Sequence, residues 1–415
     1  MDYIINGGRR LYGEISVYGA KNCALPLLGA SVLTDDEVVL HNCPKIVDVE
    51  NMVRLLQAMG KKITWQGNVL TVSGPLTSTL APQGLARLLR GSALILGSTL
   101  ARYGEIRLPL PGGCAIGKRP MDIHLVGLES MGVAVDCFDN ALTCRGKPRE
   151  ADYEMRFPSV GATENLLCAA ALTEGETTLC NCATEPEVEA LERLLVEMGC
   201  TVEGIGTPNL TVKGAKRLSG AEFTVIPDRI VAATYISAGI ASGGKVTVTN
   251  CRIEHLRSFL NVLGENFEVT EYLDAVTVDC RSQPKGYGRV TTAPYPFFPT
   301  DMQSLVLALA SFSDGGTTLI RETLFESRLE HTANELGRMG ANIRVEDNVA
   351  RVTGCGRLRG AEVTAYDLRG GAALVVAGLN ATGQTTVRGV ENINRGYLDL
   401  AGCLSALGAE IEVMP

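Results

Sequence analysis

Three segments place reactive or charged side chains beside glycine or proline, and each could take part in chemistry. The first is Gly19–Pro26 (GAKNCALP), where a strand is predicted to end and a helix to begin. The first N–H groups of a helix are unpaired and carry the positive end of its dipole, so Lys21 there suits a phosphate or carboxylate. The alternative is a solvated lysine at a helix start.

The second segment is Pro111–Pro120 (PGGCAIGKRP), a glycine-rich loop that carries Cys114. Nearby Lys118 and Arg119 favour the thiolate form of Cys114, which suits general acid or nucleophilic work. Arg119 also offers a planar fork to a carboxylate or phosphate. The alternative is a cysteine that only fills space, as expected for most of the other twelve.

The third segment is Phe298–Gln303 (FPTDMQ). Thr300 or Asp301 could cap a helix predicted over Met302–Leu309. The rival interpretation is that Asp301 presents its carboxylate as a base in a cleft between two lobes.

A repeat of about 70 residues must position these segments. A Met-Gly or Leu-Gly pair precedes a strand-like stretch six times, and a Gly or Asp before a short Val/Thr/Leu strand recurs in parallel. The glycines of the first marker are Gly60, Gly132, Gly199, Gly264, Gly340 and Gly408. Two markers that agree on six units predict an α/β protein of six repeats, arranged as two lobes of three.

Each repeat has the pattern βαβαββ. In the first one, residues 51–59 carry apolar side chains at helical spacing, and Gly60 is predicted to end that helix. Residues 63–65 and 69–72 then predict a hairpin around Gly67-Asn68. A second helix fills the rest of a repeat, as at residues 163–172. The segment Val225–Arg229 is the best candidate for a boundary between lobes.

Three arginines stand at comparable points of different repeats: Arg90, Arg369 and Arg395. Most arginines are surface residues, so each alone is a weak signal. Their recurrence is more informative, because equivalent helix ends could converge on one cleft.

Composition excludes several other classes of protein. The 415 residues include 46 acidic and 38 basic side chains, giving a net charge of −8, which argues against general nucleic-acid binding. No apolar run is long enough to span a membrane, and no signal peptide is recognised, so we expect a cytoplasmic protein. The 13 cysteines contain no C-x-x-C, and the four histidines form no ligand cluster, so no metal is expected.

These motifs together resemble the enolpyruvyl transferase family. The resemblance covers nearly the whole chain, with the Cys114 loop and the segment around Asp301 as its most specific parts. It implies a two-lobed inside-out α/β barrel of six βαβαββ repeats. It also implies one lobe at 19–226 with the Cys114 loop as a lid, a second lobe at 1–18 plus 227–415 with Asp301 and Arg395, and an active site in the cleft between them.

The implied reaction transfers the enolpyruvyl group of phosphoenolpyruvate to the 3-hydroxyl of UDP-N-acetylglucosamine and releases phosphate, through a tetrahedral ketal. This is the first committed step of peptidoglycan synthesis. No cofactor or metal is implied, and the partners are the two small-molecule substrates. Two alternatives stay open: the shikimate-pathway member of the family, which lacks a Cys-bearing loop of this type, and a silent paralogue that binds a UDP-sugar and regulates a partner.

The resemblance also assigns roles to residues. Cys114 would protonate the enolpyruvyl methylene carbon and form a covalent phosphothioketal, and Asp301 would take the proton of the sugar hydroxyl. The phosphoenolpyruvate set would be Lys21, Asn22, Arg119, Arg369 and Arg395. The sugar-nucleotide set would be Arg90, Arg119, Pro120, Met121, Asp122, Ile123, Ser159, Val160, Gly161, Asp301 and Leu324. Phe157 and Val47 depart from the family by standing where some members carry lysine.

Overall fold

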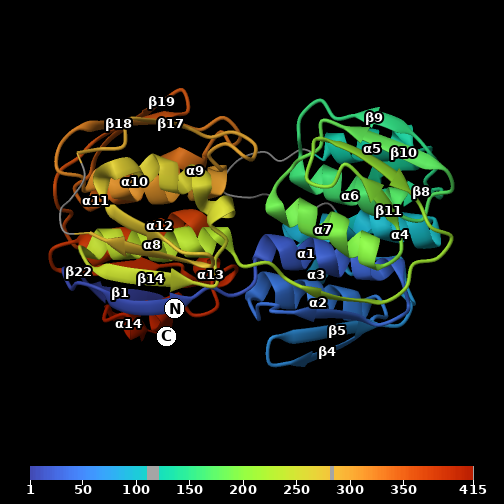
Figure 1. Ribbon diagram of the computed structural model, residues 1–415, viewed down its shortest axis with the longest axis horizontal. Coiled ribbons are helices and arrows are strands. Elements are labelled where there is room, and N and C mark those ends of the chain that lie inside the picture. The colour runs from blue at the N-terminus through green and yellow to red at the C-terminus, as the bar shows by residue number, and fades with distance from the viewer. Residues whose placement is uncertain (110–120, 281–284, 415) are drawn as a thin grey trace. The chain divides into compact units, whose positions relative to one another are not determined.

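The computed structural model describes residues 1–109, 121–280 and 285–414, apart from the side chain of Glu265. The described residues divide into two compact units. Unit 1 is built from Met1–Tyr18 and the chain that begins at Pro227, and unit 2 from the chain between Gly19 and Ile226. Each unit is an α/β structure in which sheets pack around central helices (Figure 1).

The described strands of unit 2 form three sheets, with the orders β13-β3-β5-β4, β6-β8-β7 and β11-β12-β10-β9. Their bounds are β3 (Val38–His41), β4 (Lys62–Gln66), β5 (Val69–Ser73), β6 (Glu105–Pro109), β7 (Ala134–Phe138), β8 (Ala141–Arg145), β9 (Asp152–Glu154), β10 (Glu176–Cys180), β11 (Thr201–Glu203), β12 (Asn209–Lys213) and β13 (Ala221–Thr224).

One parallel pairing closes unit 2 on itself. Strand β13 ends the third repeat and pairs with β3 of the first, with Phe223 opposite Leu40. The other two sheets receive their parallel neighbour from the segment just before, as β9 beside β10 and as the bridge between Leu80 and Arg107. The three repeats of this unit are therefore joined in a ring.

The helices of unit 2 follow the same threefold pattern. They are α1 (Lys21–Ala30), α2 (Val47–Ala58), α3 (Gln83–Ala86), α4 (Leu96–Tyr103), α5 (Asp122–Ser130), α6 (Val160–Ala170) and α7 (Pro186–Glu197), with 3₁₀ helices η1 (Ser31–Leu33) and η2 (Arg90–Ile95). Helices α4 and α6 approach closely at Gly97, where a Cβ atom would lie 1.9 Å from the carbonyl oxygen of Asn165. Only glycine fits there.

The described strands of unit 1 also form three sheets, with the orders β15-β16-β14-β2, β17-β18-β20-β19 and β21-β22-β1-β23. Their bounds are β1 (Asp2–Asn6), β2 (Tyr12–Ser16), β14 (Lys245–Thr249), β15 (Glu268–Glu271), β16 (Ala275–Asp279), β17 (Arg289–Thr291), β18 (Thr317–Arg321), β19 (Asn342–Glu346), β20 (Val349–Thr353), β21 (Glu362–Thr364), β22 (Gln384–Arg388) and β23 (Glu410–Met414). The N-terminal segment supplies β1 to one sheet and β2 to another, so it ties the first and third repeats together.

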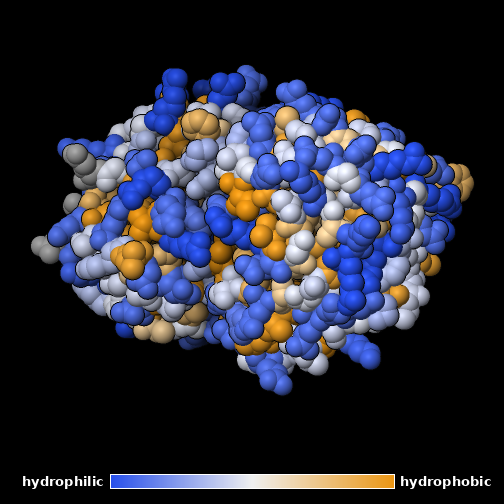
Figure 2. All heavy atoms as spheres, turned by 45° about the vertical axis from the view of Figure 1, so that its right-hand side comes forward, coloured by the Kyte–Doolittle hydropathy of each residue, from blue (hydrophilic) through white to orange (hydrophobic). Residues whose placement is uncertain are grey.

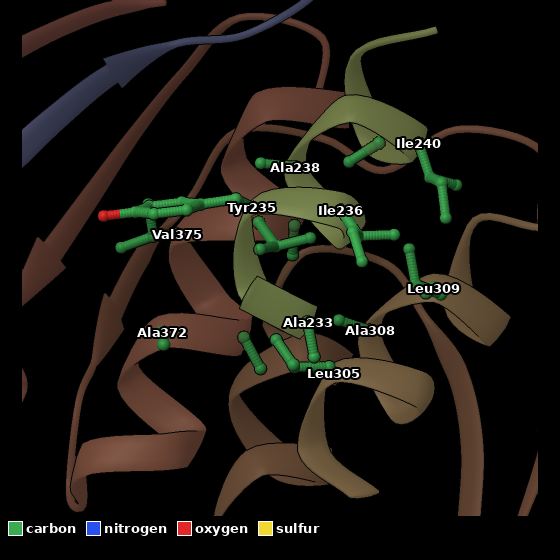
Figure 3. Packing of buried hydrophobic residues seen from close by; sticks show 14 of the residues in the cluster. Ala233, Tyr235, Ile236, Ala238, Ile240, Leu305, Ala308, Leu309, Ala372 and Val375 are labelled. Carbon is green, nitrogen blue, oxygen red and sulfur yellow. The ribbon is translucent and has the colours of Figure 1, made fainter. Parts of the chain in front are cut away.

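Three buried helices form the core of unit 1. Every residue of α8 (Arg229–Ser242), α10 (Gln303–Ser311) and α12 (Leu368–Asn380) is buried. Small side chains such as Ala233, Ala308 and Ala372 lie among larger ones where these helices meet (Figure 3). The outer helices are α9 (Ile253–Leu263), α11 (Arg328–Arg338), α13 (Val390–Asn394) and α14 (Leu400–Ala406), with 3₁₀ helices η3 (Gly264–Asn266) and η4 (Thr300–Met302).

The predicted repeat and fold class are confirmed. All six glycines of the first marker adopt positive φ, between 56° and 119°, where they follow a helix. The six strands of the second marker are β3, β6, β10, β14, β18 and β22, each in a different sheet. The hairpin predicted around Gly67 is the β4–β5 pair.

The surface is mainly hydrophilic on the face shown in Figure 2, and none of the described helices is a candidate membrane span. Hydrophilic residues dominate the face shown in Figure 2, and hydrophobic ones gather there in small groups. Within the part of the chain that the structure describes, no helix has both the length and the apolar character needed to cross a membrane.

Candidate active site

Most of the sequence-predicted site residues lie at helix N-termini. Lys21 and Asn22 open α1, Arg90 opens η2, and Asp122 and Ile123 open α5 behind Met121. Ser159 caps α6, with Val160 and Gly161 in its first turn, and Arg369 is the second residue of α12. Unpaired N–H groups and the helix dipole make such positions favourable for anionic ligands.

In unit 1 the structure brings Asp301 and Arg369 together. Arg369 Nη2 donates to Asp301 Oδ2 at 3.4 Å, and Arg328 Nη2 donates to Oδ1 at 2.6 Å. Both arginine side chains are almost fully buried, Arg328 at 2% exposed and Arg369 at 4%, whereas the side chain of Asp301 is 26% exposed. Buried cations need an anionic partner, so this carboxylate is held ionised while part of it faces outward.

The alternative in which Thr300 or Asp301 caps a helix is wrong. Thr300–Met302 form η4, α10 begins at Gln303, and neither helix receives a side-chain capping bond. The buried guanidinium groups are stronger partners for the carboxylate than a backbone N–H, and they draw it away from the helix.

A second buried carboxylate supports the same segment. Glu322, 2% exposed, accepts a hydrogen bond from the Thr300 hydroxyl at 2.8 Å through Oε2. Its Oε1 accepts from Thr292 at 3.0 Å and from the backbone N–H of Leu324 at 2.8 Å. Glu322 thus joins Leu324, one of the predicted nucleotide-sugar residues, to the segment that carries Asp301.

Arg369 is fixed from the opposite side as well. It is hydrogen-bonded to Tyr397, whose hydroxyl lies 2.7 Å from that of Thr234 on α8. Burial raises the pKa of Tyr397 although Arg369 acts against this, so the phenol stays neutral. Arg369 Nη1 has no hydrogen-bond partner among the described atoms.

Arg395 follows α13 as its C-terminal cap residue. The next residue, Gly396, packs so closely on Leu368 that a Cβ atom would lie 2.7 Å from a Leu368 methyl carbon. Arg395 precedes Gly396 and Arg369 follows Leu368. The close packing of Gly396 on Leu368 therefore holds the backbones of these two predicted phosphoenolpyruvate residues near each other.

In unit 2, Lys21 lies against a buried acid. Its ammonium group is 3.1 Å from Asp48 Oδ2, and the two side chains are 12% and 3% exposed. The sequence analysis did not single out Asp48, which stands in the first turn of α2 and has no motif of its own.

A histidine joins several of the predicted nucleotide-sugar residues. Asn165 Oδ1 accepts from the N–H of Gly97, so its amide nitrogen is the group that faces His124 Nδ1, at 3.0 Å. Nδ1 must then accept, and the proton of the neutral ring sits on Nε2. A Cβ atom on Gly161 would lie 3.1 Å from His124 Cε1, which places α6 directly against this ring.

The pKa of His124 is lowered to about 4, chiefly by burial and secondly by the nearby positive charge of Arg90, while Asp122 acts in the opposite direction. The ring is therefore uncharged at neutral pH. Arg90, Asp122 and Gly161, predicted from separate motifs, meet around a side chain for which the sequence analysis assigned no role.

The structure brings in four residues that the sequence analysis missed: Arg328, Glu322, Asp48 and His124. Each acts through a partner far away in the chain, as Arg328 does with Asp301, and none stands in a recognisable local pattern. Burial of a charged or titratable group is their common signal, and it is visible only in three dimensions.

Cys114, Arg119 and Pro120 lie outside the described residues. Eight of the 12 described cysteines are buried, in agreement with their expected role as small core residues. Phe157 and Val47, two of the positions that depart from the family pattern, are 40% and 38% exposed. Within residues 1–109, 121–280 and 285–414, no group of three His, Cys, Asp or Glu side chains could hold a metal ion.

Comparisons with known proteins show the family of the chain. The family described as EPSP synthase (3-phosphoshikimate 1-carboxyvinyltransferase) matches residues 5–404. A protein of Granulibacter bethesdensis named UDP-N-acetylglucosamine 1-carboxyvinyltransferase is 45% identical over 419 aligned positions, covering 99% of both chains. One from Caldanaerobacter subterraneus subsp. tengcongensis, named UDP-N-acetylglucosamine 1-carboxyvinyltransferase 2, is 42% identical and covers 98% of both.

Solved structures show the same fold. The enolpyruvyl transferase NikO from Streptomyces tendae superposes with a TM-score of 0.90 at 26% identity, covering 99% of this chain and 98% of that one. EPSP synthase from Acinetobacter baumannii superposes with a TM-score of 0.75 at 17% identity over the full length of both chains. The protein is therefore a member of the family of EPSP synthase and related enolpyruvyl transferases.

Proposed function

We propose that the protein transfers the enolpyruvyl group of phosphoenolpyruvate to the 3-hydroxyl of UDP-N-acetylglucosamine and releases inorganic phosphate. The observation that carries this proposal is the agreement, over nearly the full length, with relatives whose names state a 1-carboxyvinyl transfer involving UDP-N-acetylglucosamine. The first committed step of peptidoglycan synthesis would then be its role, and the cytoplasm, where such precursors are made, its location.

The reaction needs one proton donor, one proton acceptor and a set of cations. The sugar hydroxyl adds to C2 of phosphoenolpyruvate while the methylene carbon gains a proton, giving a tetrahedral ketal. Loss of a methyl proton and cleavage of the C2–O bond to phosphate then restore the double bond. We assign the donor to Cys114, which also fits a covalent phosphothioketal with phosphoenolpyruvate.

Asp301 is the proposed acceptor of the sugar hydroxyl proton. Support comes from its ionised carboxylate, which two buried arginines hold at one side while 26% of the side chain remains exposed. A general base must be ionised and within reach of the proton that it removes. The two arginines would also stabilise the negative charge that develops nearby.

The phosphoenolpyruvate anion is assigned to Lys21, Asn22, Arg119, Arg369 and Arg395. Arg369 supports this assignment because its buried Nη1 has donor capacity with no partner among the described atoms. An oxygen of the substrate would satisfy that donor, and an unsatisfied buried donor is otherwise costly.

The sugar nucleotide is assigned to Arg90, Asp301, Leu324, the residues from Arg119 to Ile123 and those from Ser159 to Gly161. His124 lies in the first turn of α5, near Arg90 and against α6, so one half-buried ring links the elements that would hold this substrate. Because His124 is neutral, it adds no second positive charge beside Arg90.

The test is phosphate release by the purified full chain with phosphoenolpyruvate and three acceptors: none, UDP-N-acetylglucosamine, and 3-phosphoshikimate. We expect phosphate release only when UDP-N-acetylglucosamine is the acceptor. Mass spectrometry should then detect its enolpyruvyl ether. Cys114→Ala should reduce release strongly, while Cys137→Ala, which removes an exposed cysteine, serves as the matched control.

Three other outcomes would change the assignment. Release that requires 3-phosphoshikimate would give the chain the acceptor named in the family description. Release that survives in Cys114→Ala would keep the reaction and remove Cys114 as the donor. Folded protein that binds UDP-N-acetylglucosamine without any release would be a silent paralogue, and the transferase function would be refuted.

A further inference from the structure

The Asp301 carboxylate stands at one end of a hydrogen-bonded network of four buried or half-buried side chains in unit 1. Glu322 accepts from the Thr300 hydroxyl at 2.8 Å, Arg328 Nη1 donates to the same hydroxyl at 2.9 Å, and Arg328 Nη2 donates to Asp301 at 2.6 Å. The hydroxyl has one proton, and Arg328 can only donate. Thr300 must therefore donate to Glu322 and accept from Arg328, so its orientation is fixed.

Burial and hydrogen bonding hold Glu322 and Arg328 in fixed positions. Glu322 and Arg328 are each 2% exposed, so neither side chain is satisfied by bulk water. Glu322 accepts four hydrogen bonds, from Thr292, Thr300 and the N–H groups of Leu324 and Phe325. Four hydrogen-bond donors hold the Glu322 carboxylate in one orientation. Its bond to Thr300 fixes that hydroxyl, which in turn fixes the guanidinium of Arg328.

We propose that Glu322, Thr300 and Arg328 are positioning residues that fix the orientation of the Asp301 carboxylate for proton transfer. This inference rests on the proposed function, since it presumes that Asp301 acts on a substrate hydroxyl. None of the three needs to touch a substrate. Their effect is to hold one carboxylate oxygen on Arg328, so that the exposed part of the group presents a defined lone pair.

The same geometry sets the basicity of Asp301. Among the described residues, Arg328 from α11 and Arg369 from α12 contact this carboxylate, and Glu322, Asp228 and Tyr397 act on those arginines. Two adjacent cations weaken a base. Glu322 and Asp301 are anions on either side of Arg328, the first through the Thr300 hydroxyl and the second directly, so both compensate one buried guanidinium.

The decisive variant is Thr300→Val, with Thr300→Ser as its matched control. Valine keeps the shape of threonine and loses the hydroxyl, whereas serine keeps the hydroxyl and loses the methyl group. We expect Thr300→Val to lower kcat for phosphate release roughly tenfold to a hundredfold, the range for one lost hydrogen bond to charged groups. KM for both substrates should stay within about threefold, and Thr300→Ser should stay close to wild type.

Glu322→Gln provides a second, independent readout. Removing the negative charge leaves Arg328 less compensated, so the acid limb of the kcat profile should move to lower pH, and kcat on the plateau should fall. A merely structural role would lower the amount of folded enzyme and leave the position of the limb unchanged. Circular dichroism and thermal unfolding check that each variant is folded.

Several results would overturn the proposal. These are wild-type kcat in Thr300→Val, equal losses in the Val and Ser variants, a change confined to KM, or an acid limb of Glu322→Gln that moves upward. If the wild-type protein releases no phosphate at all, the proposed function fails by itself. Crystal structures then decide the positioning: Asp301 must turn away from Arg328 in Thr300→Val and not in Thr300→Ser, and an unmoved carboxylate refutes it.

Discussion

The neutral, half-buried His124 gives a prediction whose size follows from the structure. Its pKa falls from the usual 6.5 to about 4 because of burial first and Arg90 second. The unfolded chain therefore binds this proton more tightly than the folded one does. Stability contributed by the neutral ring is fully present above pH 6.5 and is lost as the pH falls toward 4.

The expected loss follows from linkage. With a pKa of 6.5 in the unfolded chain and about 4 in the folded one, the free energy of unfolding should fall by about 2 kcal/mol between pH 7 and pH 5 through this group alone. His124→Gln should lack this component, because an amide does not titrate and can still hydrogen-bond to Asn165. At pH 7 the variant should be less stable than wild type, and at pH 5 the difference should shrink or reverse.

The assay is urea unfolding followed by tryptophan fluorescence. Trp65 is the only tryptophan of the chain and lies on β4, so the signal reports the unfolding of unit 2, which also contains His124. Other carboxylates titrate equally in both proteins, and their effects cancel in the difference. Parallel losses in wild type and His124→Gln between pH 7 and pH 5 would refute the reasoning.

Two further predictions concern packing and chemistry. Gly97→Ala should lower the stability of unit 2 by about 3 kcal/mol, since its Cβ atom would lie 1.9 Å from the Asn165 carbonyl oxygen. Gly84→Ala, with open space around it, is the control and should be neutral or slightly stabilising in the same fluorescence assay; equal effects would contradict the packing argument. Asp301→Asn should reduce kcat for phosphate release by about a hundredfold to ten-thousandfold, the usual contribution of a general base, and a rate within tenfold of wild type would remove Asp301 from that role.

The fold was predictable because its signals are local and repeated. Gly60 and its five counterparts all end helices with positive φ, a conformation that favours glycine, so they mark the repeat directly in the sequence. The central strands are just as visible, since Val38–His41 and its equivalents are short Val-, Thr- and Leu-rich stretches that follow a Gly or Asp. Six copies of one signal exceed what any single motif could establish.

Parts of the topology have no local signal. The pairing of β13 with β3, and the insertion of β1 between β22 and β23, join segments far apart in the chain, such as Ala221 with Val38 and Tyr3 with Val387. Nothing in residues 2–6 identifies them as the inner strand of a sheet whose other strands come from the end of the chain. Such pairings depend on the closure of each unit as a whole.

The candidate site divides in the same way. The sequence by itself determined the repeat, the fold class and the polar residues at helix starts, such as Lys21, Arg90 and Asp301, because spacing and helix ends are properties of neighbouring residues. Only the tertiary structure decided which charges meet. Arg328 reaches Asp301 across 27 residues of chain, and Glu322 reaches Thr300 across 22. Their role arises from burial, which forces each charge to find a partner in space.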